Sequence, residues 1–170
     1  MDFSELVKKR YSCKNYGERP VEDDKLAVIL EAGRQAPTAK NLQEQRIYVA
    51  RSEEALAKID AITRCRYGAS TVLIVAFDTA NTFTYPGGMR DSGVEDASIV
   101  ATHMMLAAAS VGVDSCWINL FDPAEVARVF ELPENEEVLM LLDLGYAAEG
   151  AGPLPNHGNR KPLEETVSFI

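Results

Sequence analysis

The chain of 170 residues alternates two hydrophobic patterns, which predict an alternation of helices and strands. Apolar residues that recur every three or four positions predict amphipathic helices, and continuous runs rich in β-branched residues predict strands buried on both faces. The expected helices cover residues 2–9, 22–35, 52–59, 94–111 and 122–131, and the expected strands cover residues 46–50, 70–77, 114–121 and 136–145. Residues 1–170 are expected to form a single domain of the α/β or α+β class.

The strongest helical segment, residues 94–111, is apolar on nearly every side. A helix with this pattern, in which Ile99 and Met104 lie on different faces, is typically buried. We therefore expect either a central core helix or a helix packed at a subunit interface. Asp96 lies near its start, where the helix dipole favours an acidic side chain. For His103 we expect a hydrogen-bonded core or interface position rather than a catalytic role.

The chain is acidic, and this limits its partners. The net charge is −9, with 46% hydrophobic and 25% charged residues, which argues against nucleic acid or an anionic membrane as the main partner. No segment approaches the roughly 20 consecutive apolar residues that a membrane span needs. The N-terminal residues do not have the pattern of a signal peptide. We therefore expect a cytoplasmic protein.

The three cysteines, Cys13, Cys65 and Cys116, are widely spaced along the chain. No Cys-x-x-Cys or His-x-x-x-His motif accompanies them, so a metal site has little support and reduced thiols are expected. Cys13 lies between Arg10 and Lys14, whose charges could lower the pKa of its thiol. No histidine can be placed beside it from the sequence, so we do not expect it to act as a nucleophile.

The segment 10–16 places Arg10, Ser12 and Lys14 at alternate positions. In an extended segment these three side chains point to the same side. Two cations and a hydroxyl on one face suit an oxyanion, most naturally a phosphate. The alternative interpretation is the basic end of a short helix, which the helix dipole favours.

A second polar stretch, residues 36–43, follows the expected helix 22–35. Pro37 should end that helix, because proline biases the residue before it toward extended geometry. Thr38, Asn41 and Gln43 then offer hydroxyl and amide groups that both donate and accept hydrogen bonds. Such a loop suits a flat ring with polar edges, although an ordinary solvated turn has the same composition.

Together these two stretches resemble the nitroreductase family of flavin enzymes. That family has an Arg-x-Ser-x-Arg-x-Phe segment near its N-terminus, followed by an Ala-Pro-Ser-Ala-x-Asn-x-Gln segment. The matching residues are Arg10, Ser12, Lys14, Tyr16, Ala36, Pro37, Thr38, Ala39, Asn41 and Gln43, and later Asp96, Leu106, Ala107, Ala108, Gly112 and residues 159–165. The resemblance therefore runs along the whole chain. Lys14 departs from the pattern because a lysine lacks the planar fork that binds phosphate at two points.

The resemblance implies an α+β fold, an α/β-like three-layer sandwich with a central mixed sheet flanked by helices. It also implies a homodimer with the helix 94–111 at its interface and FMN bound there without a covalent bond. The phosphate end would be held by Arg10, Ser12, Lys14 and Arg160, with Lys161 as a lesser candidate. The flavin would be bordered by Pro37, Thr38, Ala39, Asn41 and Gln43 of the partner and lined by Trp117, Ile118 and Asn119, with Gly145 allowing close approach.

Two further features of the sequence leave alternatives open. Trp117 suits a core position as well as a contact with the ring. Residues 79–93 form a long connection with the composition of a functional loop or of a flexible connector. The resemblance implies that this region lies near the exposed face of the flavin, so Phe83 or Tyr85 could contact the substrate.

The sequence contains no motif for chemistry by side chains alone. It lacks Gly-x-Gly-x-x-Gly, Walker and Gly-x-Ser-x-Gly patterns, as is typical of an enzyme whose cofactor performs the reaction. The resemblance implies that NADH or NADPH reduces FMN, which then reduces nitroaromatics, quinones or similar small acceptors in a ping-pong cycle. The alternatives are a flavin-binding sensor or carrier without turnover, or another flavin reaction such as dehalogenation or flavin breakdown.

Overall fold

The computed structural model describes residues 2–170 and has the expected alternation of helices and strands. The helices are α1 (Phe3–Lys9), α2 (Asp23–Arg34), α3 (Glu53–Ile62), α4 (Gly93–Ser110) and α5 (Pro123–Val129). The strands are β1 (Gln45–Ala50), β2 (Thr71–Asp78), β3 (Asp114–Ile118) and β4 (Glu136–Gly145). Short 3-10 turns occupy Ala39–Asn41, Arg64–Arg66, Thr79–Asn81 and Leu163–Glu165.

The four strands form one sheet in the order β1-β2-β4-β3. All three strand pairs are antiparallel, so these strands do not form the expected mixed sheet. The one parallel pairing within residues 2–170 is the isolated bridge between Ser12 and Ser115, where the N-terminal segment lies beside β3. The two central strands, β2 and β4, are buried along most of their length, as their apolar runs predict.

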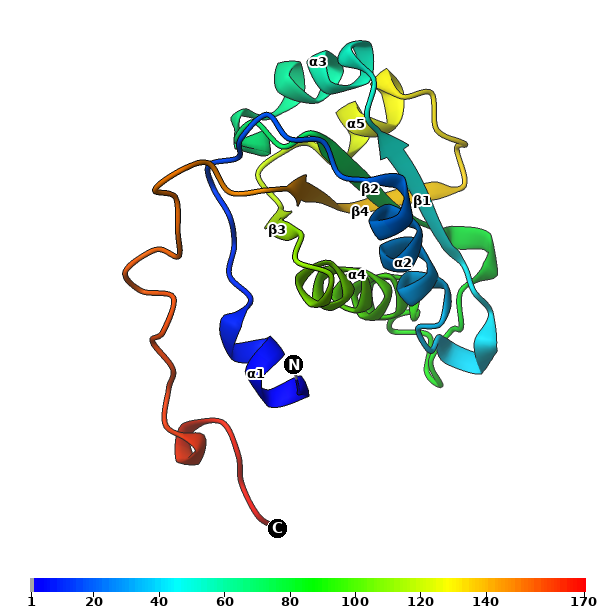
Figure 1. Cartoon of the computed structure of the whole chain (residues 1–170). Coiled ribbons are helices and arrows are strands. Elements are labelled where there is room, and N and C mark those ends of the chain that lie inside the picture. The colour runs from blue at the N-terminus through cyan, green and yellow to red at the C-terminus, as the bar shows by residue number, and fades with distance from the viewer. Residues whose placement is uncertain (1) are drawn as a thin grey trace.

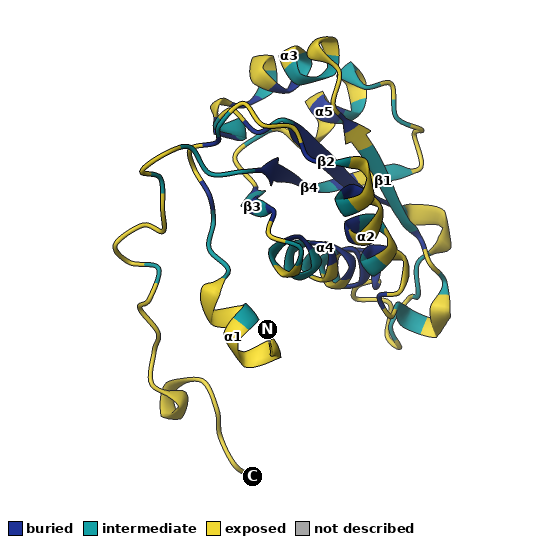
Figure 2. Ribbon diagram, viewed as in Figure 1, coloured by how far each residue is buried: buried dark blue, intermediate teal, exposed yellow. Residues whose placement is uncertain are grey.

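Helices cover both faces of the sheet, which confirms the α+β class and the three-layer arrangement (Figure 1). One face packs against α2 and α4, with Leu73, Met104 and Leu142 in the shared core. The other face packs against α3 and α5, with Ile59 and Leu141 in a second core. The ribbon of β2 and much of that of β4 are dark blue in Figure 2, which marks buried residues, while much of α3 is exposed.

Local capping signals fix where two of the helices begin. The Ser52 side chain accepts a hydrogen bond from the Ala55 amide at 3.1 Å, as the expected cap of α3. Asp122 accepts from the Ala124 amide at 2.9 Å, and Pro123 follows it as the first residue of α5. These side chains satisfy amide groups that would otherwise lack a partner at a helix start.

The long helix α4 packs closely on α2 but leaves part of its apolar surface uncovered. A Cβ atom at Gly33 would lie 2.8 Å from Cγ of Met104, so the glycine permits the close approach of the two helices. On the outer side of α4, Val94 and Ile99 are exposed to solvent in the single chain. Within residues 2–170, no helix is both long enough and apolar enough to cross a membrane.

The two ends of the chain extend away from the sheet on the same side (Figure 1). The segment after residue 152 has little regular structure and is exposed along most of its length (Figure 2). Its apolar side chains Leu163, Val167 and Phe169 are exposed, as is Phe3 of α1. These termini therefore bury little apolar surface against their own chain.

Candidate functional site

The segment after α1 is extended and lies beside β3. The Cys13 amide donates to the Ser115 carbonyl at 2.9 Å, which fixes the segment against the strand. Ser12 and Lys14 line a hollow of about 280 Å³ together with Trp117, Cys116, Leu154, Asn156 and His157. The structure therefore brings Ser12 and Lys14 to one hollow, as the alternating pattern predicts, but Arg10, which was expected on the same face, does not line it, because it ends α1 and is not part of the extended segment.

Arg10 lies at the C-terminal end of α1 and lines a neighbouring hollow of about 210 Å³. This second hollow also contains Tyr11, Ala109 and Gly112, so it lies at the C-terminal end of α4. Neither Arg10 nor Lys14 forms a salt bridge with a carboxylate within residues 2–170. Asp114 also lines the hollow of Arg10 but forms no salt bridge with it. In a chain of net charge −9, two cations without a salt bridge in adjacent hollows are candidates for binding an anion.

The C-terminal segment approaches this region through His157. Its ring meets the Tyr11 ring edge-on, with centroids 6.4 Å apart and planes at 77°. Arg160 is exposed and donates to the carbonyl groups of His157 and Asn159 at 2.6 and 2.7 Å. Lys161 pairs with Glu165 at 3.4 Å. The tail and the N-terminal segment are thus neighbours, while a shared phosphate contact of Arg160 and Lys161 stays a prediction.

The loop after α2 has an unusual backbone. Lys40, Asn41 and Gln43 have positive φ angles of 51°, 57° and 55°. Each residue of this kind costs on the order of 1 kcal/mol or more, and such residues concentrate at functional sites. Such angles also occur at Tyr67 and Glu131, and asparagine tolerates them in ordinary turns, so a binding role for Asn41 and Gln43 stays a prediction.

Hydrogen bonds from the protein hold this loop in place. The Ala39 amide donates to both carboxylate oxygens of Asp96, at 3.1 and 3.0 Å. The backbone amide of Gln43 donates to the Thr38 hydroxyl at 3.0 Å. Asp96 therefore anchors the loop to the first turn of α4, and Thr38 closes the loop on itself. Pro37 precedes these contacts and lies beyond the end of α2, where it was expected to stop the helix.

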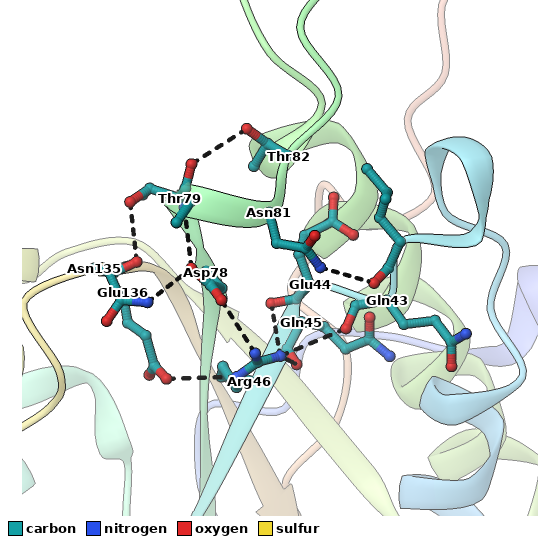
Figure 3. A network of polar contacts seen from close by, with 12 residues as sticks. Gln43, Glu44, Gln45, Arg46, Asp78, Thr79, Asn81, Thr82, Asn135 and Glu136 are labelled. Atoms are coloured by element: carbon teal, nitrogen blue, oxygen red, sulfur yellow. Dashed lines mark hydrogen bonds and ion pairs between the residues drawn. The ribbon is translucent and has the colours of Figure 1, made fainter.

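A polar network fixes the far end of the same loop (Figure 3). Asn81 donates to the Leu42 carbonyl at 3.0 Å. Arg46 donates to the Glu44 carbonyl at 3.2 Å and forms salt bridges with Asp78 at 3.3 Å and Glu136 at 3.5 Å. The loop is thereby tied to the ends of β2 and β4.

The connection 79–93 is ordered around two aromatic rings. Phe83 and Tyr85 lie 5.5 Å apart between ring centroids. The Lys40 ammonium lies 4.5 Å from the centre of the Phe83 ring, and the Arg90 guanidinium lies 4.5 Å from that of Tyr85. This connection therefore contacts the loop 37–43 directly, which favours a functional loop over a flexible connector.

The two candidate binding segments lie at opposite ends of α4. Asp96, in the first turn, holds the loop 37–43, and Ala109, in the last turn, lines the hollow of Arg10. With a rise of 1.5 Å per residue, these positions are about 20 Å apart along the helix. Figure 1 likewise shows the N-terminal segment and the turn that precedes β1 near opposite ends of α4.

Two of the residues expected at the flavin ring have other roles in the structure. Ile118 is 4% exposed and belongs to the core beneath α5, so its side chain is not available to a ring. A Cβ atom at Gly145 would lie 2.8 Å from Cδ1 of Tyr16, so the space beside this glycine is filled by the chain itself. Trp117 is half-buried and donates to the Asn119 side chain at 2.8 Å, at the rim of the hollow of Lys14.

Sequence reasoning missed two buried carboxyl groups. Glu44 is completely buried next to the loop 37–43, and Asp143 is 1% exposed in the middle of β4. Neither oxygen of Asp143 has a hydrogen-bond partner within residues 2–170. Burial raises the pKa of Asp143 to about 9, while the nearby Arg66 partly opposes the shift. For Asp143, the signal available in the sequence was an acidic residue inside a continuous apolar run.

Cys13 and Cys116 have higher pKa values than an activated thiol would have. Burial raises the pKa of the Cys13 thiol, so the suggestion that Arg10 and Lys14 lower it is wrong. Burial, with the charge of Asp143, raises the pKa of Cys116 to about 11. All three cysteines are free and buried, and thiols in such surroundings are unreactive.

Comparisons with family models, related sequences and solved structures all indicate the same family. The model of the nitroreductase family matches residues 7–67 and 61–146. A crystal structure of a nitroreductase family protein from Clostridium difficile 630 superimposes with a TM-score of 0.93, at 38% identity over 99% of this chain and 98% of that one. A Methanothermobacter thermautotrophicus protein, provisionally named an NADH dehydrogenase/NAD(P)H nitroreductase, is 31% identical over 89% of this chain and 81% of its own length.

The fold is also shared with a more distant protein that was crystallised with FMN. That nitroreductase-type protein from Exiguobacterium sibiricum superimposes with a TM-score of 0.85, at 23% identity over 100% of this chain and 98% of that one. At this level of identity the likeness concerns the fold.

Proposed function

Because the chain belongs to the nitroreductase family, we propose that it is an FMN-dependent oxidoreductase. It takes hydride from NADH or NADPH and reduces a small electron-poor acceptor, such as a nitroaromatic compound or a quinone, in a ping-pong cycle. The observation that carries the proposal is the pair of unneutralised cations, Arg10 and Lys14, beside Ser12 in an otherwise acidic chain.

The residues at this end suit the phosphate of FMN. Arg10, Lys14 and the Ser12 hydroxyl supply charged and neutral donors, and the tail adds Asn156 and His157 to the rim of the same hollow. Arg160 follows closely in sequence, and within residues 2–170 its guanidinium donates to main-chain carbonyl groups and to no carboxylate. We propose that this exposed side chain joins the phosphate contacts when FMN binds, and that Lys161 supports the local positive charge.

The residues at the other end suit the isoalloxazine ring. Thr38, Asn41 and Gln43 offer donors and acceptors to a ring with polar edges. The positive φ angles at Asn41 and Gln43 fix the direction of the neighbouring amide groups before any ligand arrives. Pro37 and Ala39 would border the ring without competing for its hydrogen bonds.

A homodimer would join the two ends into one site. An isologous interface places the same surface of both copies together. If the exposed apolar side of α4, with Val94 and Ile99, packed antiparallel on its copy, the loop of one chain would face the cations of the other. The exposed apolar residues of α1 and of the tail would be covered by the same association, which explains why the single chain leaves them uncovered.

FMN, when bound, would accept and store the hydride, so the chain's own residues are needed for binding and orientation. Ser12 and Lys14 would hold the phosphate, and the loop 37–43 would align one edge of the ring. Trp117 lies at the rim of the phosphate hollow, where it would limit the access of water, and Asn119 accepts a hydrogen bond from its indole. Phe83 and Tyr85 would form an aromatic wall near the acceptor.

The visible spectrum of the purified protein tests the proposal. A flavin spectrum that bleaches with NADH or NADPH without oxygen, and returns when a quinone is added, supports the reductase. A bound flavin that neither donor reduces would indicate a sensor or carrier instead. A protein that binds no FMN in a direct titration would refute the proposal.

An arginine variant tests the phosphate site separately. A hydrogen bond to a charged group contributes about 1.5–3 kcal/mol, so Arg10→Ala should weaken FMN binding by roughly 10- to 150-fold. Arg128→Ala, which removes an exposed guanidinium on α5, is the matched control and should leave the affinity unchanged. Equal affinities for the two variants would remove Arg10 from the site.

A further inference from the structure

A pair of buried carboxyl groups lies directly behind the loop 37–43. Glu44 is fully buried, and one of its oxygens accepts a hydrogen bond from the Ser92 hydroxyl at 3.2 Å. Its other oxygen, Oε2, finds no hydrogen-bond donor within residues 2–170. Asp96 is a neighbour of Glu44, because the same Ser92 whose hydroxyl binds Glu44 accepts the Asp96 backbone amide at 2.8 Å through its carbonyl group. Both oxygens of Asp96 hold the Ala39 amide.

This arrangement requires a proton between the two groups. Two ionised carboxylates are acceptors only and repel each other when water is excluded. Protonation of Glu44 turns its Oε2 into a donor toward Asp96, which removes the repulsion and satisfies the unpartnered atom. The pKa of Glu44 is accordingly raised, first by burial and then by the neighbouring carboxylate of Asp96.

No cation takes the place of this proton among the charged groups around the pair. Arg46 binds the Glu44 carbonyl rather than its carboxyl group, and its charge is shared with Asp78 and Glu136. The Lys40 ammonium lies over the Phe83 ring. On α4, Glu95 interacts with Tyr85 and Arg90, so it faces away from the pair.

We propose that protonated Glu44 is a positioning residue for the flavin-binding loop, because its carboxyl group donates a hydrogen bond to Asp96 and thereby fixes the group that holds the Ala39 amide. The loop has three non-glycine residues at positive φ, so its conformation needs such an external anchor. The link to FMN rests on the proposed function, whereas the carboxyl pair itself belongs to the protein without ligand.

Loss of the proton at higher pH would place two negative charges in one buried site. The Asp96 carboxylate would move away from Glu44, the Ala39 amide would lose its partner, and the loop would relax from its binding conformation. FMN affinity should therefore fall as the pH rises through the pKa of Glu44. With one linked proton, the dissociation constant can rise by at most about tenfold per pH unit.

The decisive comparison uses the full-length protein and two substitutions of Glu44. Glu44→Gln has nearly the same shape and always carries an amide donor for Asp96, so FMN affinity should lose the part of its pH dependence that the Glu44 proton causes, and only the dependence from the titration of the FMN phosphate itself should remain. Glu44→Leu supplies no donor and should bind FMN weakly throughout this range. Glu53→Gln, an exposed position at the start of α3 on the opposite face of the sheet, is the charge-matched control and should follow the wild type.

An NMR measurement without flavin separates this inference from the proposed function. The amide signal of Ala39 should titrate with the Glu44 proton in the wild type and in Glu53→Gln, and should stay constant in Glu44→Gln. A titration in Glu44→Gln identical to that of the wild type would overturn the inference. If the protein bound no FMN but the Ala39 signal titrated as expected, the proposed function would fail while the carboxyl pair would stand.

Discussion

Replacement of Asp143 by asparagine should make the stability of the protein less dependent on pH. Asp143 lies opposite Val72 of β2 and Cys116 of β3, in the centre of the sheet. It is 1% exposed, and neither of its carboxyl oxygens has a partner within residues 2–170. An unpaired charge in such surroundings is very costly, so the group keeps its proton in the native state.

The magnitude follows from the two pKa values of this group. Burial raises the pKa of Asp143 from 3.8 to about 9 in the folded protein. Its contribution to stability is therefore fully present below pH 3.8 and is lost as the pH rises toward 9, because only the unfolded chain releases the proton. Between these values the free energy of unfolding should fall by about 1.4 kcal/mol per pH unit.

Asparagine has nearly the same shape and needs no proton, so this loss should disappear in Asp143→Asn. The difference in stability between Asp143→Asn and the wild type should grow in favour of the variant by about 3 kcal/mol from pH 6 to pH 8. Urea unfolding followed by circular dichroism, at fixed protein concentration and without added flavin, measures this difference at each pH.

Asp24→Asn provides the control, because it makes the same chemical change at an exposed position in the first turn of α2. Its stability should run parallel to that of the wild type over the same pH range. If Asp143→Asn also ran parallel to the wild type, Asp143 would be ionised in the native protein, and the argument from burial would be wrong.

Two further predictions concern packing and thiol reactivity. Gly145→Ala should destabilise the protein by about 1–3 kcal/mol in a thermal unfolding assay, because the new Cβ atom would lie 2.8 Å from the Tyr16 ring. Gly152→Ala is the control and should have little effect, because no atom lies within 4 Å of its new Cβ atom. Cys116 is 2% exposed, and burial raises the pKa of its thiol to about 11. Iodoacetamide at neutral pH should therefore modify Cys116 far more slowly in the native protein than in urea, which mass spectrometry can measure. Equal rates would show that the thiol is accessible.

The relative direction of the strands is a feature that the hydrophobic pattern of the sequence does not predict. The apolar run that becomes β2 is typical of a strand buried on both faces, which is common in parallel sheets, yet all strand pairs here are antiparallel. Burial on two faces depends on the helices above and below the sheet and leaves the direction of the neighbouring strands open. The route of the connections between strands decides that direction.

The candidate site, too, was predictable from the sequence only in part. The order and spacing of residues 10–16 and 36–43 were sufficient to indicate the family and an anion site near Lys14. The sequence did not show that Ile118 is turned into the core or that Tyr16 fills the space beside Gly145. Both depend on which side of a strand faces which neighbour.

The sequence by itself determined the helices and strands, the caps at Ser52 and Asp122 and the family, because these depend on local patterns and on short motifs of fixed spacing. Only the tertiary structure decided that Glu44 is buried beside Asp96 behind the loop 37–43, and that Asp143 is buried without a hydrogen-bond partner within residues 2–170. The pKa of a carboxyl group is set by the water it loses and the charges it meets, and both come from residues distant in the chain.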